Sequence, residues 1–171
     1  MRRAIRTLVA CAVIAGAAPV ARATAAPVDA QPRRGPAKVA FAKVVLDEQR
    51  AYFYNQAKRL IVTLPVSTGT DDQTPVGVFK VFSKSELAIF TPAPNERMRY
   101  MVRFTKGREG DNIGFHGIPF KVTKSGEVPF YTPLGVAPSS HGCIRMLETD
   151  AKWVFDNMAL GTRVTVVRSR T

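Results

Sequence analysis

The sequence of 171 residues has few of the side chains that hold metals or cross-link chains, since it contains two cysteines and two histidines. Acidic residues are also scarce, at 13 against 25 lysines and arginines, which gives a formal net charge of +12. The apolar run from Leu8 to Val20 is shorter than the roughly 20 residues that a membrane-spanning helix needs. The sequence therefore predicts no membrane span, and its basic balance favours an anionic partner.

Residues 1–23 have the pattern of a secretory signal peptide. Three arginines precede the apolar run, and small residues around Ala21 and Ala23 match an A-x-A cleavage site. We expect cleavage there, a flexible linker at 24–38 and one folded domain at 39–168. The protein would then be periplasmic or secreted with a net charge of +8 from Thr24 onward. In that compartment anionic envelope polymers are better partners than nucleic acid, and simple solubility is the alternative explanation of the charge.

From Val39 onward the pattern becomes that of short strands separated by turn residues. Segments 39–47, 50–55 and 58–69 are rich in β-branched and aromatic residues. In 97–104 apolar side chains alternate with arginines, which indicates a half-buried strand with a basic outer face. We therefore expect a mostly β fold with largely antiparallel strands.

One helix is predicted in the C-terminal half, because apolar residues between 147 and 162 follow helical spacing. Thr149 or Asp150 could cap its start, and Gly161 stands where a C-terminal cap belongs. A final strand is expected after it, at 162–168.

Cys143 and His116 are the candidates for chemistry. If Cys11 leaves with the signal peptide, Cys143 is unpaired, which suggests intermolecular pairing or a reactive thiol, with an inert buried cysteine as the alternative. The thiolate is the nucleophilic form, and a nearby imidazole can generate it. His141 belongs to the same turn as Cys143, so the distant His116 is better able to reach the sulfur through the fold.

The residues around Cys143 fit acyl transfer better than metal binding. Gly142 permits a tight turn whose N–H groups can point at a developing oxyanion, and Arg145 is placed to bind a substrate carboxylate. A zinc site from His116, His141 and Cys143 is the competing interpretation. However, His-x-Cys is an uncommon zinc spacing and no H-E-x-x-H motif is present. We expect no metal and no cofactor.

Several motifs occur together in one order. A His-Gly pair at 116–117 precedes a Ser-His-Gly-Cys-Ile-Arg block at 140–145. Weaker matches are Thr-Pro-x-Gly-x-Phe at 74–79, Met-x-Tyr at 98–100 and Gly-Thr-Arg-Val at 161–164. This set resembles the L,D-transpeptidases of the YkuD type, bacterial enzymes that remodel peptidoglycan, over residues 39–168.

That resemblance implies a single β-sandwich catalytic domain with one helix and a flap over the active-site groove. It also implies that Cys143 attacks a tetrapeptide stem between meso-diaminopimelate and the terminal D-Ala, which releases D-Ala and leaves a thioester. Another stem, forming a 3→3 crosslink, or an envelope-protein lysine would then accept the acyl group. Inhibition by carbapenems is a further implication of the resemblance.

The resemblance also assigns residue roles. His116 is the general base and then acid, and the carbonyl of Gly117 orients its ring. The oxyanion pocket is formed by His141, Gly142 and Cys143. Substrate would be held by Tyr100, Ser140 and Arg145.

Two alternatives and one departure accompany this hypothesis. With water as acceptor the same residues would make an L,D-carboxypeptidase or amidase, and a domain without activity would be a wall-binding module. The spacer of 23 residues between His116 and Ser140 is longer than is usual in the family. We expect it to contain a hairpin turning at 124–126, which could wall the groove and alter specificity.

Overall fold

The structure is a computed structural model that describes residues 35–170. The expected signal peptide at 1–23 and most of the expected linker at 24–38 lie outside the described residues. Within 35–170, no helix has the length and apolar character needed to cross a membrane.

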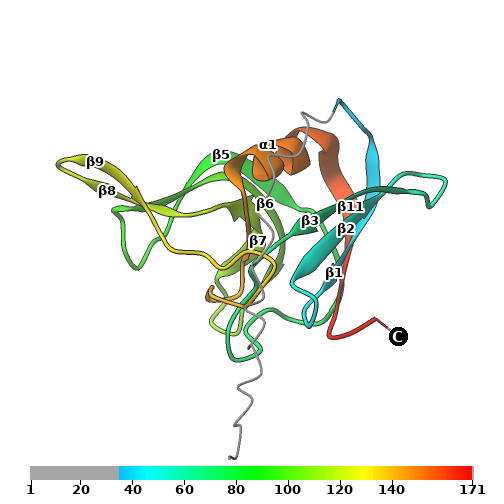
Figure 1. Ribbon diagram of the computed structural model, residues 1–171, viewed down its shortest axis with the longest axis horizontal. Helices are drawn as coiled ribbons and strands as arrows, with labels where there is room; N and C mark the ends of the chain where they lie inside the picture. Colours follow the sequence, from blue (N-terminus) through cyan, green and yellow to red (C-terminus); the bar gives the residue numbers. More distant parts are fainter. Residues whose placement is uncertain (1–34, 171) are drawn as a thin grey trace, which may run out of the picture. The chain divides into compact units, whose positions relative to one another are not determined.

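The predicted strand-rich fold is confirmed, and its strands form two sheets (Figure 1). The first sheet has the order β3-β2-β1-β11-β4. These strands span Leu60–Pro65, Arg50–Tyr54, Val39–Val45, Met158–Val167 and Gly77–Lys80. The β1–β11 pair is parallel and the other pairs are antiparallel, so the last strand of the chain lies beside the first.

The second sheet has the order β10-β7-β6-β8-β9, and β5 also pairs with β6. These strands span Ile144–Met146, Asn112–Gly117, Glu96–Lys106, Phe120–Thr123, Gly126–Pro129 and, for β5, Ser83–Ile89. Only the β10–β7 pair is parallel here among the described strands. Strand β6 spans 11 residues and pairs with three strands, which makes it the central strand of this sheet.

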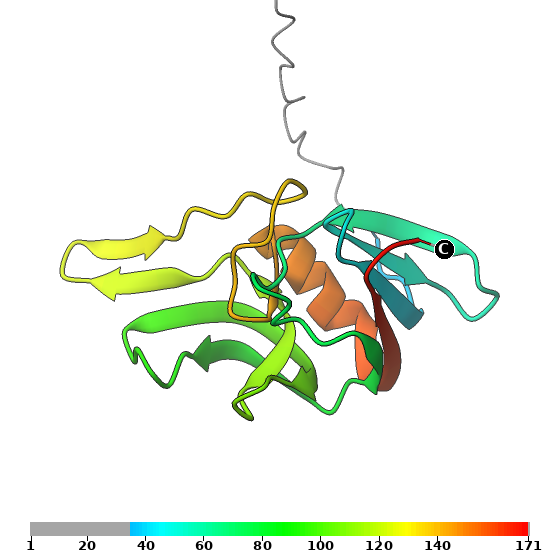
Figure 2. The ribbon, with the colours of Figure 1, turned by 90° about the horizontal axis from the view of Figure 1, so that it is seen from below.

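The predicted helix is α1, Glu148–Asn157, and it lies between the two sheets (Figure 2). Its predicted caps are wrong. Leu147 occupies the N-cap position without a side-chain hydrogen bond, and Thr149 and Asp150 lie in the first turn. The chain enters β11 directly after the helix, so Gly161 lies within that strand. There it adopts a left-handed φ of +81° where the register between β1 and β11 shifts.

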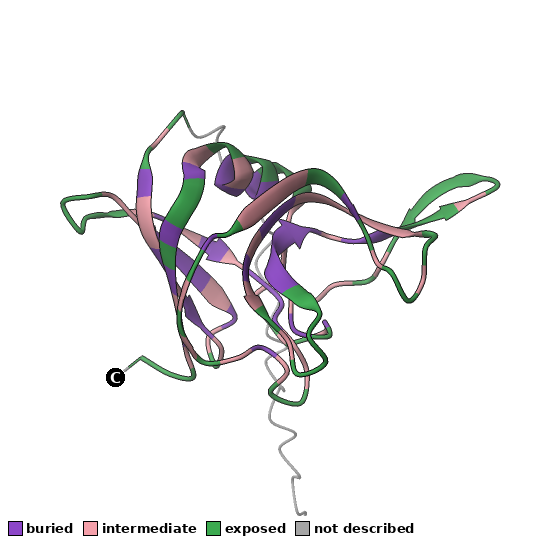
Figure 3. Ribbon diagram, turned by 180° about the vertical axis from the view of Figure 1, so that it is seen from behind, coloured by how far each residue is buried: buried purple, intermediate pink, exposed green. Residues whose placement is uncertain are grey.

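Aromatic side chains from both sheets and the helix meet in the core. The ring of Phe53 in β2 lies 5.7 Å from Phe115 of β7 and 5.8 Å from Trp153 of α1, between centroids. Phe104 of β6 lies 5.1 Å from Phe115 and 5.8 Å from Phe79 of β4. Buried residues follow the inner surfaces of the sheets (Figure 3). These tilted and edge-on contacts therefore join both layers and the helix.

Phe53 lies in the first sheet and contacts both the second sheet and the helix, so its removal should destabilise the whole domain. We expect Phe53→Ala to lower the free energy of unfolding by about 3–5 kcal/mol, because a buried aromatic leaves a cavity. Denaturant unfolding followed by circular dichroism measures this. Leu160→Ala, at a side chain that is 64% exposed, is the control and should change stability by less than about 0.5 kcal/mol. Equal small effects of both substitutions would contradict this account of the core.

Candidate active site

Parallel pairing of β10 with β7 brings Cys143 and His116 onto neighbouring strands. In the register of this pair, Arg145 stands opposite His116. Cys143 is the residue before β10, and its Sγ lies 3.6 Å from the carbonyl oxygen of Asn112 at the start of β7. The fold thus brings together two residues that are far apart in the sequence.

Both strands turn these side chains away from the core. Phe115 of β7 and Ile144 of β10 belong to the core cluster. Side chains alternate between the two faces of a strand. His116 and Arg145 therefore lie on the opposite face of the sheet, and Cys143, two residues before Arg145, shares that face.

His116 is buried, and its pKa is lowered to about 4. Burial is the main cause of the lowered pKa, and the positive charges of Arg145 and Arg103 lower it further. The hydrogen bond to Gly117 acts in the opposite direction and raises it. Nδ1 lies 2.6 Å from the carbonyl oxygen of Gly117, so in the neutral ring Nδ1–H donates this bond. Nε2 is then unprotonated at neutral pH and able to accept a proton.

The Cys143 thiol has a pKa raised to about 11. Burial is the main cause, and the negative charge of Asp111 also raises the pKa. The backbone of Gly114 and the charges of Arg145 and Arg103 partly oppose this rise. Such a thiol stays protonated at neutral pH and needs a base to become a nucleophile. A protonated thiol and a neutral imidazole on the same face of neighbouring chain segments suit general-base activation rather than a preformed ion pair.

Two hydroxyl groups hold the turn before Cys143. Ser140 Oγ accepts a hydrogen bond from the N–H of Gly142 at 3.0 Å and donates to the carbonyl of Cys143 at 2.6 Å. Thr74 Oγ1 accepts from the N–H of Gly69 at 2.8 Å and donates to the carbonyl of Gly142 at 2.7 Å. The connection between β3 and β4 is therefore tied to the turn.

Glycine is required at position 142 by conformation and by space. Its φ of +127° is one that L-residues rarely adopt. A Cβ there would lie 2.6 Å from Cδ1 of Ile113 and 2.9 Å from the carbonyl oxygen of Gln73. The turn is consequently packed from both sides.

The hydrogen bonds of the turn involve two residues with expected roles, Ser140 and Gly142. The Ser140 hydroxyl is buried and bonded within the turn. Its expected contact with substrate stays a prediction. The Gly142 N–H is bonded to that hydroxyl, so it is not available to an oxyanion in this conformation. The N–H groups of His141 and Cys143 remain the predicted donors.

Arg145 is held at one end of its guanidinium. Its Nη1 donates to the carbonyl oxygen of Ser139 at 2.9 Å and to Ser139 Oγ at 3.3 Å. Its backbone pairs with Ser67, which fixes the strand on its outer side. Nε is buried without a hydrogen-bond partner among the described residues. Part of its donor capacity is therefore unused.

The chain was compared with known proteins. The family model YkuD, the L,D-transpeptidase catalytic domain, matches residues 40–166. The chain belongs to this family. It is 32% identical over 127 residues to YciB of Bacillus subtilis (strain 168), covering 72% of this chain and 63% of that protein. It is 30% identical over 131 residues to ErfK/SrfK of Escherichia coli (strain K12), covering 70% and 41%. Both are named as L,D-transpeptidases.

A solved structure has the same fold. The L,D-transpeptidase LdtMt1 in complex with imipenem superposes with a TM-score of 0.58 and 23% sequence identity. The match covers 74% of this chain and 58% of that one. The predicted fold class is thereby confirmed for this YkuD domain.

In this YkuD domain Tyr100 lies on the core side of β6. Its ring packs 5.9 Å from Phe155, and the Nζ of Lys152 lies 5.5 Å from its centroid, both on α1. Tyr100 also has a φ of +58°, which is uncommon for a residue other than glycine. The structure does not bring Tyr100 to the face that holds Cys143, so its expected contact with substrate stays a prediction.

His141 is exposed, and its ring stacks on Phe90. The ring centroids are 5.9 Å apart with an interplanar angle of 3°. Phe90 follows β5 in the connection to β6, so this connection contacts the turn that holds Cys143. The expected flap over the groove stays a prediction. The sequence held no signal for this contact, because the partners lie in separate loops.

The long spacer forms the predicted hairpin. Thr123 pairs with Gly126, so β8 and β9 are joined by a two-residue turn, and the hairpin projects from the sheet in Figure 1. Arg99 of β6 donates to both carboxylate oxygens of Glu127 on β9 at 2.7 and 2.9 Å, and to Glu148 at 3.2 Å. Its guanidinium lies 4.2 Å from the ring centroid of Phe120.

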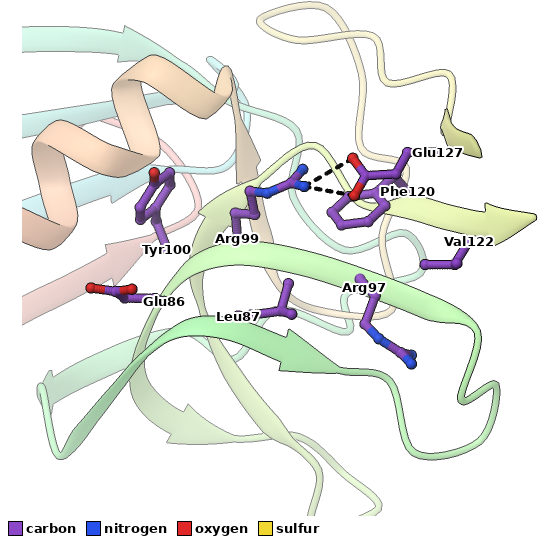
Figure 4. Close-up of a pocket in the computed structure, with 8 residues that line it drawn as sticks. All are labelled: Glu86, Leu87, Arg97, Arg99, Tyr100, Phe120, Val122 and Glu127. Carbon is purple, nitrogen blue, oxygen red and sulfur yellow. Dashed lines mark hydrogen bonds and ion pairs between the residues drawn. The ribbon is translucent and has the colours of Figure 1, made fainter.

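These contacts border a cavity of about 280 Å³ between the hairpin and β5–β6 (Figure 4). Tyr100, Leu87 and Val122 are among the side chains that line it. Neither Cys143 nor His116 is among the residues that line it. The hairpin in the spacer of this YkuD domain therefore lines one side of this cavity.

The lowered pKa of His116 predicts a loss of stability in acid. The unfolded state, with a histidine pKa near 6.5, takes up this proton first as the pH falls. Neutral His116 therefore contributes about 3 kcal/mol to the free energy of unfolding above about pH 6.5. This contribution is lost progressively as the pH falls to about 4. Denaturant unfolding at pH 7.5 and pH 4 should show wild type losing about 3 kcal/mol more than His116→Gln. Equal losses would contradict this assignment.

Proposed function

We propose that this domain is a cysteine-dependent L,D-transpeptidase that acts on the tetrapeptide stems of peptidoglycan. The observation that carries the proposal is the neutral His116, held by Gly117 on the strand next to the protonated thiol of Cys143. Membership of the YkuD family supports the reaction class. No cofactor is needed, because the thiol and imidazole together supply nucleophile, base and acid.

In the first half-reaction, Cys143 Sγ attacks the carbonyl carbon of the amide between meso-diaminopimelate and D-Ala. The thiol proton passes to Nε2 of His116, and the backbone N–H groups at His141 and Cys143 stabilise the oxyanion. The C–N bond then breaks, and His116 returns the proton to the amine of the departing D-Ala. A thioester on Cys143 remains.

In the second half-reaction, an amine attacks the thioester. Its proton passes to His116, the C–S bond breaks, and the proton returns to the sulfur as the thiol re-forms. An amine of another stem gives a 3→3 crosslink, and a protein lysine gives wall attachment. If water attacked instead, the product would be a tripeptide, and the enzyme would be a carboxypeptidase.

The cellular setting is part of the proposal. The chain spans 63% and 41% of the lengths of the two curated relatives, so their complete activities are not transferred. We propose that residues 1–23 direct export and that the domain works in the periplasm or cell envelope. The basic composition suits the anionic wall polymer found there.

Purified protein incubated with disaccharide-tetrapeptide should yield crosslinked dimers and free D-Ala. Cys143→Ala should abolish both products, because no other described cysteine is present to form the thioester. Mass spectrometry of the products measures this, with Leu160→Ala as a folded control. Tripeptide monomers without dimers would instead favour water as acceptor. Full activity of Cys143→Ala would overturn the nucleophile assignment, and an inactive wild type would favour a wall-binding module.

A carbapenem should acylate the same residue. A solved relative of the same fold is bound to imipenem, and a β-lactam presents a strained amide to the nucleophile. We expect intact-mass spectrometry to show one imipenem adduct on wild type and none on Cys143→Ala. An adduct that persists in Cys143→Ala would count against the assignment.

A further inference from the structure

Three adjacent strands align Arg103, Gly114 and Cys143 in one row across the second sheet. Arg103 of β6 stands opposite Gly114 of β7. Ile144 of β10 stands opposite Phe115 on the other side of β7, so Cys143 falls beside Gly114. The row runs from β6, through a residue without a side chain, to the nucleophile.

Arg103 lies on the same face of the sheet as Cys143. Its neighbours Val102 and Phe104 are buried in the core, so alternation turns Arg103 outward. At Gly114 a Cβ would lie only 2.2 Å from the carbonyl oxygen of Val102, which keeps this position bare. No side chain therefore stands in the row between Arg103 and Cys143.

Arg103 and Arg145 flank the nucleophile without acidic partners. Arg103 Nη1 donates to Ser85 Oγ at 2.8 Å, and Arg145 Nη1 is held by Ser139. Within residues 35–170, neither guanidinium forms an ion pair with a carboxylate. Both charges lower the pKa of Cys143, in agreement with their positions on this face, while the carboxylate of Asp111 raises it. Two half-buried cations this close to one site favour an anionic ligand.

We propose that Arg103 and Arg145 form a two-arginine site that binds two carboxylates of one donor peptide, one on each side of the scissile amide. The inference rests on the proposed function, whose donor has both groups. The departing D-Ala has a terminal carboxylate, and meso-diaminopimelate has a free carboxylate at its side-chain end. Each guanidinium binds one of them through charge-assisted hydrogen bonds, while Ser85 and Ser139 fix the two heads. The site thereby selects a dianionic donor and places its amide over Cys143.

The test measures binding without turnover. Calorimetry on Cys143→Ala uses three peptides: the tetrapeptide, its C-terminal amide, and an analogue amidated at the side-chain carboxylate. Adding Arg103→Gln should weaken binding of the tetrapeptide about tenfold or more. For one of the two amidated peptides, Arg103→Gln should weaken binding less than twofold, because that peptide lacks the carboxylate that Arg103 binds. Arg145→Gln should likewise weaken binding of the tetrapeptide but have less than a twofold effect on the other amidated peptide. Arg163→Gln, an exposed arginine of the first sheet, controls for net charge and should change nothing.

Several results would overturn the two-arginine site. These are no measurable binding of the tetrapeptide, no loss with Arg103→Gln, or equal loss with all three peptides. Thermal unfolding of each variant excludes a loss caused by misfolding, and Arg103→Lys should recover only part of the binding because it lacks the planar fork. Release of D-Ala by wild type is measured separately. Carboxylate-selective binding without release of D-Ala would refute the proposed reaction but support the two-arginine site. Release of D-Ala without carboxylate-selective binding would support the reaction and refute the site.

Discussion

The parallel pairing of β10 with β7 determines where every group of the site lies. It sets Arg145 opposite His116 and leaves Cys143 beside Gly114. A shift of one residue would turn Cys143 into the core and Ile144 outward, since side chains alternate along a strand. The register is held from the core side by Ile144 and Met146, which are fully buried, and from the outer edge by the backbone pairing with Ser67. The packing of the core and the proposed catalysis therefore both depend on one alignment.

The hydroxyls of Ser140 and Thr74 complete this alignment within the loops. Each bonds the backbone of the turn, so the Ser-His-Gly-Cys motif serves geometry as much as reactivity. The Thr-Pro-x-Gly motif is weak as a sequence match, yet its threonine makes one of these bonds. Both motifs were recognised in the sequence, but these bonds were not predicted, since Thr74 and Gly142 lie 68 residues apart and only the fold joins them.

Features that depend on pairing between distant strands were less accessible to sequence reasoning. Alternation predicted an outward basic face for 97–104, but only the β6–β7 register shows that Arg103 lies in the row of Cys143. The helix limits failed for a related reason. Gly161 has the conformation of a cap, but β11 continues through it because parallel pairing with β1 accommodates a shift there. Tertiary pairing overrode the local signal.

Burial has opposite effects on the two reactive groups, and the result is a neutral resting pair. It raises the pKa of Cys143 to about 11 and lowers that of His116 to about 4. Burial favours the neutral form of each group, so an ion pair does not form before substrate arrives. A protonated thiol is also slow to oxidise, because the thiolate is the reactive form. For the exported enzyme proposed above, this is a way to keep an unpaired thiol reduced in an oxidising compartment. In the proposed mechanism, the arginines on either side would then stabilise negative charge once the substrate's amide is in place and His116 has taken the proton.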